Sequence, residues 1–147
     1  MATLAAVRAG LRTTLEDRVD VNGYDTVPSS PLLPAVVVMP RSAEFEVGLG
    51  EGVDDLWLFD LVVLCSAGVG ELGQEALDEF ITGAGPRSIR QALHQSYRGG
   101  RPPYQIGLPN TKARLRGWGG YGLRHPSAEI DHISALGLVE VRTSAEV

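Results

Sequence analysis

The sequence predicts a single α+β domain, residues 1–147, in which an antiparallel sheet packs against two or three helices. The order of the apolar patterns is the first reason: one helical repeat, then strand patterns, then two helical repeats, then strand patterns again. Composition is the second, because 44% hydrophobic and 21% charged residues in 147 fit one packed domain.

The first element is expected to be an amphipathic helix. Its apolar residues recur at helical spacing, namely Leu4, Val7, Leu11 and Leu15. Thr3 precedes them as an N-cap. The stretch from Val19 to Tyr24 is expected to form a turn, and the proline-rich residues after it an extended connection.

Three strands are expected in the first half of the chain. Ala35 to Met39 is a run of apolar residues closed by Pro40, which predicts a strand covered on both faces. Phe45 to Leu49 alternates with glutamates, which predicts a half-buried strand. Asp55 to Cys65 is the longest strand pattern in the sequence.

Two helices and two strands complete the predicted domain. The first helix ends before Gly83 and has an apolar stripe of Leu72, Ala76, Leu77, Phe80 and Ile81. Pro86 opens the second at its first position, with inward residues Ile89, Ala92, Leu93 and Tyr97. The last strands are Thr111 to Arg124 and Glu129 to Arg142.

One motif is typical of nucleotide-binding enzymes. Residues Gly68 to Gly73 spell G-x-G-x-x-G between a predicted strand and a predicted helix, where a pyrophosphate would bind. However, Glu71 would place a carboxylate beside the phosphates, the second parallel strand is missing, and no acid stands between Glu79 and Glu129 to hold a ribose. We expect a plain glycine turn and no cofactor; unaltered thermal stability in NAD(H) or ATP would count against the enzyme alternative.

Other reactive side chains predict no catalytic or metal site. His94, His125 and His132 do not share a metal-ligand spacing. Cys65 is the single cysteine and ends an apolar run, so we expect an inert buried thiol. Asp60 interrupts the longest apolar stretch, which excludes a membrane-spanning helix there.

Charge is divided unevenly along the chain. Residues 80–128 contain eight basic residues and no acid, whereas the remainder holds five basic and all 18 acidic residues, so that +8 and −13 give the net −5. A nucleic-acid-binding face would use such a stripe, with possible stacking groups Tyr97, Tyr104, Trp118 and Tyr121. Self-association of basic and acidic faces would use it equally. We favour self-association because the net charge is acidic.

The Asp55–Cys65 strand is apolar on both faces. One face carries Trp57, Phe59, Leu61 and Val63, and the other carries Leu56, Leu58, Asp60, Val62 and Leu64. Helices in a domain of this size usually cover one face of a sheet. Either the Trp57/Phe59 or the Leu56/Leu58 set is therefore expected to contact a neighbouring subunit, unless the loop from Arg98 to Asn110 folds over it.

Several segments together share their order with one known family. They are the N-terminal helix, Pro34 to Val38, the glycine-tipped pair around Phe45 to Cys65, Gly85 to Leu93, Trp118, Tyr121-Gly122 and Ala135 to Val141. This order resembles the tail terminator family of siphophages, especially versions from phages of actinobacteria. The resemblance covers nearly the whole chain as a pattern, although the Arg98–Asn110 loop is longer than in many relatives.

The resemblance implies a non-enzymatic protein of the virion, with no catalytic residues. Its members form a hexameric ring that docks on the last ring of the tail tube, halts tube polymerisation and offers a surface to the head connector. Phage DNA passes through the lumen without sequence-specific binding.

The sequence also nominates contact residues. For subunit or tube contacts these are Gly50, Asp54, Leu56, Trp57, Leu58 and Phe59. For the lumen or a neighbour's acidic face they are Lys112, Arg114 and Arg116. Another neck or tail component, such as a head-closure or tube protein, is the nearest alternative, and a nucleic-acid-binding accessory protein is the next.

Overall fold

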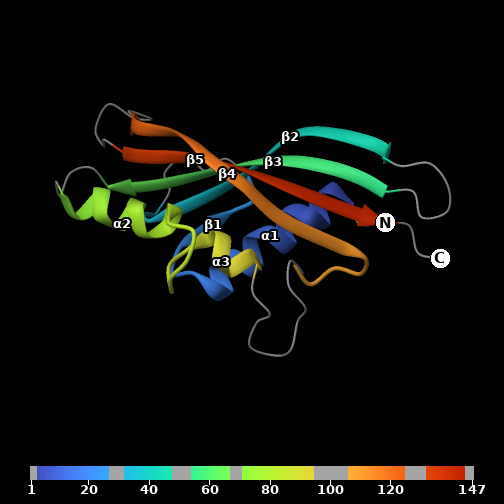
Figure 1. Cartoon of the computed structure of the whole chain (residues 1–147), viewed down its shortest axis with the longest axis horizontal. Helices are drawn as coiled ribbons and strands as arrows, with labels where there is room; N and C mark the ends of the chain where they lie inside the picture. The colour runs from blue at the N-terminus through green and yellow to red at the C-terminus, as the bar shows by residue number, and fades with distance from the viewer. Residues whose placement is uncertain are drawn as a thin grey trace.

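The computed structural model describes residues 3–26, 32–47, 54–66, 71–94, 106–124 and 132–144. Within these ranges the chain forms three helices and one five-stranded sheet, which confirms the α+β class (Figure 1). In chain order the elements are α1 (Leu4–Arg18), β1 (Asn22–Tyr24), β2 (Ala35–Val47), β3 (Asp54–Ser66), α2 (Glu71–Ile81), α3 (Ile89–His94), β4 (Thr111–Arg124) and β5 (His132–Ser144).

The sheet is mixed rather than wholly antiparallel. Its strand order is β1-β2-β3-β5-β4. Three of the pairings are antiparallel, whereas β1 runs parallel to β2, with Asn22 opposite Ala35. The sequence had predicted a turn at this point. The Asn22 side chain explains the difference, because its Nδ2 donates to the Leu32 and Pro34 carbonyls and holds the returning chain alongside.

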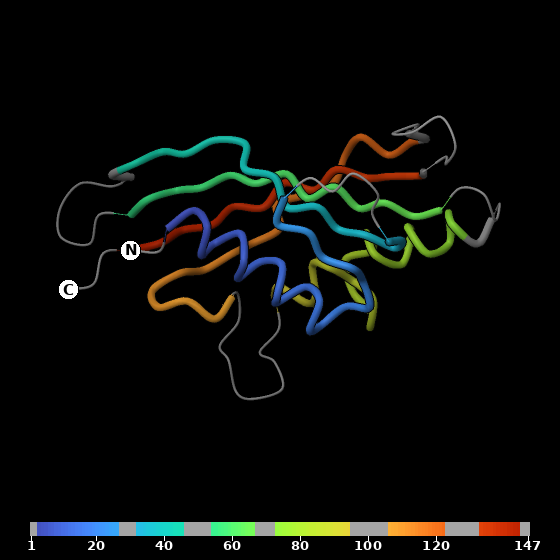
Figure 2. The backbone as a smooth tube through the Cα atoms, turned by 180° about the vertical axis from the view of Figure 1, so that it is seen from behind, coloured from blue at the N-terminus to red at the C-terminus, as the bar shows by residue number. Residues whose placement is uncertain are grey.

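All three helices lie on the same side of the sheet, as the views from front and back agree (Figures 1 and 2). Thr3 caps α1 as predicted, its Oγ1 accepting from the Ala6 amide at 3.2 Å. The core lies between helices and sheet, and its fully buried members include Val7, Leu11, Leu15, Phe59, Leu61, Val63, Leu77, Phe80, Ile89 and Leu93.

Several element boundaries differ from the prediction; β5, for example, ends at Ser144 and not at Arg142. The strand expected to close at Pro40 continues to Val47, with a shift of register between Pro40 and Ser42 that accommodates a residue without an amide hydrogen. Phe45, expected to be half-buried, is 64% exposed. The helix expected from Pro86 begins at Ile89, because Pro86 lies in the turn before it.

Candidate interaction surface

The sheet face opposite the helices carries a row of apolar side chains. We call this the open face, and its apolar members are Met39, Leu56, Leu58, Leu136 and Leu138, with Asp60 among them. Val62 is on the same side of the sheet but packs against the covered end described next. No described helix lies over it (Figures 1 and 2). Leu58 and Leu138 are only partly buried, since neighbours in the sheet shield their flanks, and Met39 is 38% exposed.

One end of this sheet face is closed by the chain itself. Ala35, Val37 and Leu64 are buried there, and Tyr24 and Leu33 pack against them. These contacts form a small second core on the far side of the sheet. The uncovered part is therefore the middle of the sheet and the end at which β3 begins.

The register decides which set of β3 side chains is uncovered. Phe59 is 0% exposed beneath the helices, so its prediction as an interface residue is wrong. Trp57 also points to the helix side, where it packs partly buried against the core. Leu56 and Leu58 lie on the open face, and their contact with a neighbour stays a prediction.

The remaining predicted contact residues are in the tip before β3. Asp54 begins the strand, accepts from the Ser144 hydroxyl at 2.6 Å and pairs with Arg142 at 3.8 Å. Gly50 lies outside the described residues. Most of the loop from Arg98 to Asn110, which could have covered the sheet, also lies outside the described residues. Its described end carries Ile106, which is buried in the helix-side core.

A shallow hollow of about 450 Å³ lies on the open face next to β4. Leu136 and Leu138 form its apolar wall. Gly117 and Gly119 have no side chain to cover their backbone, and the space beside each is open, since a Cβ there would meet nothing within 4 Å. Arg41 and Asp60 form an ion pair at its margin, with Arg41 Nη1 3.6 Å from Asp60 Oδ1. The hollow thus has an apolar surface bordered by charged side chains, an arrangement that is common in protein interfaces.

The predicted basic residues of β4 lie beside this hollow on the same side of the sheet. We call them, with one residue of β5, the basic cluster: Lys112, Arg114, Arg116 and Arg142. Glu140 stands among them, with Oε2 3.7 Å from a nitrogen of Arg114 and of Arg116, and Oε1 3.2 Å from Arg142 Nε. A single carboxylate, 15% exposed, thus serves three guanidinium groups that are each about half exposed or more.

The cluster remains positively charged after these pairings. Asp54 is the second acid within reach, through Arg142. Among the described residues, four cations face two carboxylates, and this leaves an excess of positive charge that an anionic partner would relieve. Sequence reasoning missed Glu140 and Arg142, because which strand lies beside β4 is decided by the sheet order and not by local pattern.

The structure separates the aromatic residues that were candidates for stacking on nucleic acid. Trp118 packs against the helix-side core. Tyr121 is 44% exposed but lies beside α2, with its hydroxyl donating to Asp78. Tyr97 and Tyr104 are outside the described residues. The basic cluster is therefore not accompanied by a row of exposed rings within the described part of the chain.

The glycine motif lies in a different setting from the one a dinucleotide site needs. Of its residues, Glu71, Leu72 and Gly73 are described, all in α2. The described neighbours of β3 are β2 and β5, and both run antiparallel to it. The parallel strand that would complete a nucleotide-binding unit is thus not found beside β3 among the described strands.

The remaining reactive groups show no arrangement for catalysis in the described residues. Burial raises the pKa of the Cys65 thiol to about 11, with a smaller opposing effect of Arg87, so the thiolate is disfavoured. His94 is exposed at the end of α3, and the described residues hold no group of three His, Cys, Asp or Glu placed to bind a metal.

Within the described part of the chain, none of the helices is long and apolar enough to span a membrane. Comparison with protein-family models and with curated proteins found no match.

Proposed function

We propose that this chain is a structural subunit of a long-tailed bacteriophage virion, the tail terminator, which acts as a ring of identical copies at the head-proximal end of the tail tube. The observation that carries the proposal is the open face. It presents Leu56, Leu58, Leu136 and Leu138 from two central strands, where no described element of the chain covers them.

The open face favours assembly for a physical reason. An antiparallel sheet with one free face normally places polar residues on it, so that hydrophobic and polar residues alternate along each strand. Here the central strands keep leucine and valine on both faces, and continuous exposed apolar surface marks a contact site. Covering such side chains stabilises an assembly by about 25 cal/mol per Å² of apolar surface removed from water.

The more specific role comes from the sequence pattern. The resemblance to siphophage tail terminators supports a ring, hexameric in that family, that docks on the last tail-tube ring and joins it to the head connector. A ring follows from a contact between two different surfaces of the same chain when the rotation closes. DNA then passes through the lumen without sequence-specific contacts.

Native mass and negative-stain imaging of the purified chain test this proposal. We expect a ring of fixed copy number that does not grow into cylinders, and that ends tube growth when mixed with polymerising tube protein. Long cylinders formed by the chain alone would instead identify a tube protein. A monomer at all concentrations would contradict the proposal.

Single substitutions link the assembly to the open face. Leu58→Asp and Leu138→Asp place a carboxylate on this face and should abolish the ring, while circular dichroism shows a folded chain. Ala5→Asp is the matched control, because Ala5 is exposed on α1, on the opposite side of the molecule. Rings formed equally well by Leu58→Asp and by the control would show that the open face is not the contact.

A further inference from the structure

Negative charge gathers on a second surface, formed by α2 and the end of β4. Glu75, Asp78 and Glu79 are exposed on α2, and Tyr121 of β4 lies beside them, its hydroxyl 3.1 Å from Asp78 Oδ1. We call these four residues the acidic surface. Glu79 is partly neutralised by Arg87 at 3.0 Å, an exposed pair, whereas Glu75 has no ion pair within the described residues.

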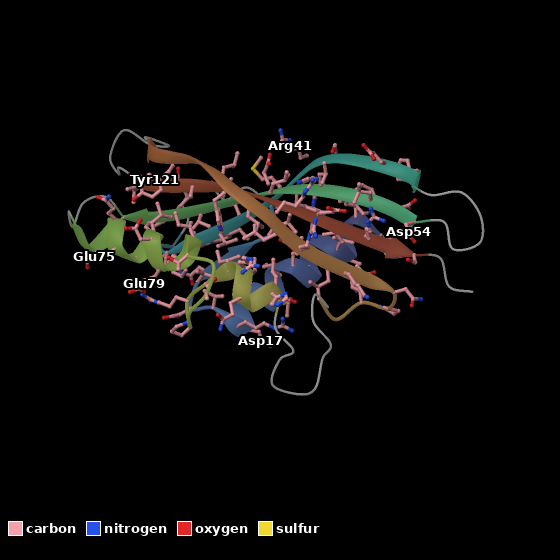
Figure 3. All side chains as sticks on the ribbon, viewed as in Figure 1. Asp17, Arg41, Asp54, Glu75, Glu79 and Tyr121 are labelled. Carbon is pink, nitrogen blue, oxygen red and sulfur yellow. The ribbon has the colours of Figure 1, made fainter. Side chains whose placement is uncertain are left out.

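The acidic surface lies at one end of the molecule, and the basic cluster runs from the middle of the sheet toward the other end. Figure 3 shows Glu75, Glu79 and Tyr121 at one end of the long axis and Asp54 at the other. Asp54 pairs with Arg142, which places that side of the basic cluster toward the second end. Lys112 is opposite Arg142 in the sheet, near the start of β4. Within the described residues, no ion pair joins the two charged surfaces of one copy.

We infer that the acidic surface of one copy docks on the basic cluster of the next, in a head-to-tail contact. This inference rests on the proposed self-assembly and names the second half of its interface. The carboxylates of Glu75 and Glu79 would meet arginines that share Glu140 at 3.7 Å, and these loose pairs leave donor groups for a second acid.

The same contact brings apolar surface together. Tyr121 is the exposed ring of the acidic surface, and tyrosine is enriched in interface cores because it buries a large ring and keeps one polar end. On the other copy, Leu138 of the hollow lies next to the basic cluster, since Leu138 and Glu140 are alternate residues on the same face of β5. In the proposed contact, the aromatic side chain of Tyr121 would lie beside Leu138 of the next copy while the carboxylates reach its arginines.

Charge also decides the direction of assembly. A two-fold contact centred on the basic cluster would set Arg114 and Arg116 against their own copies, with Glu140 as the nearby acid. Like charges across an interface disfavour binding, whereas opposite charges fix the register. A head-to-tail contact uses two different surfaces, which is the geometry that closes into a ring.

Charge reversal with complementation tests the contact. Glu75→Lys/Glu79→Lys makes both surfaces basic, and Lys112→Glu/Arg114→Glu makes both acidic. We expect each variant alone to assemble at least tenfold more weakly than the unaltered chain. An equimolar mixture of the two should restore the assembly, because basic and acidic surfaces then alternate around it. Ala5→Lys/Thr13→Lys on the exposed side of α1 is the control, because it adds two lysines away from both charged surfaces, and it should assemble normally.

The outcomes separate this inference from the proposed function. If the unaltered chain forms rings and the mixture stays dissociated, or if either reversed variant assembles like the control, the inference is overturned and the proposed function stands. If the unaltered chain is a monomer, both fail. If Lys112→Glu/Arg114→Glu keeps the ring but loses salt-dependent affinity for duplex DNA, the basic cluster is a phosphate-binding surface and the inference is wrong.

Discussion

A single glycine decides where Trp118 lies. Gly137 of β5 is opposite Trp118 of β4, and a Cβ at this position would lie 2.8 Å from Trp118 Cζ3 and 3.1 Å from Leu115 Cδ1. Because Gly137 has no side chain, the Trp118 indole can lie over the backbone of β5 and pack on the helix-side core. This contact explains why Trp118 is not available as a stacking surface for nucleic acid.

We expect Gly137→Ala to lower the free energy of unfolding by about 1–3 kcal/mol, because the added methyl group overpacks against the Trp118 ring. Gly119→Ala is the control, since a Cβ there meets nothing within 4 Å. Its effect should lie between no change and a gain of about 1 kcal/mol from reduced unfolded-state entropy. Urea denaturation measures both values, and equal midpoints would show that the Trp118 contact carries no strain.

At the scale of elements, α3 is too short to be stable alone. It has six residues, whereas isolated helices need roughly 12–15 to be even marginally stable in water. Ser88 fixes its start, with Oγ accepting from the Gln91 amide at 3.2 Å and donating to the Thr82 carbonyl. Gln91 in turn accepts from the Gly85 amide at 2.7 Å. Hydrogen bonds at its first turn and the burial of Ile89, Ala92 and Leu93 thus stabilise α3.

Ser88→Ala should destabilise the fold by about 1–2 kcal/mol, through loss of the cap and of the partner of the Thr82 carbonyl. Ser88 is 1% exposed, so water cannot readily replace the hydroxyl. Thr13→Ala on the exposed side of α1 is the control and should change stability by no more than about 0.5 kcal/mol. Thermal or urea unfolding followed by circular dichroism compares them; a loss no larger than that of the control would contradict the role of Ser88.

At the scale of the whole molecule, the sheet has unequal faces. The helix side is packed around Phe59, Leu61 and Val63, which are 0% exposed. On the other side, Tyr24 and Leu33 cover one end, and the middle is left to Leu58 and Leu138. In the proposed assembly, a second copy that covered that middle would therefore add to the stability of the folded chain.

The melting temperature should consequently rise with protein concentration, because association stabilises the native state by mass action. Calorimetry across a hundredfold range of concentration measures the trend. For Leu58→Asp we expect a melting temperature that is independent of concentration and no higher than that of the dilute unaltered chain, because a carboxylate in a central strand also destabilises the monomer. A concentration-independent melting temperature for both chains would indicate that covering the open face adds no stability.

Local sequence patterns determined most of the elements. The helical repeat of α1, its Thr3 cap and the bounds of β4 were predictable because they depend on residues close together in the chain. The boundary of α3 was not, since Pro86 satisfies the rule for a helix start but lies in the turn that Ser88 closes. The continuation of β2 beyond Pro40 could not be predicted either, because the register shift that allows it depends on the partner strand.

The sequence by itself determined that β3 is apolar on both faces and that basic residues concentrate in the second half of the chain. Only the tertiary structure decided that Phe59 belongs to the core while Leu58 remains uncovered, and that Glu140 and Arg142 join Arg114 in one cluster. The physical reason is that alternation along a strand sorts side chains into two sets, but the side on which the helices pack, and the order of the strands, arise from contacts between distant segments.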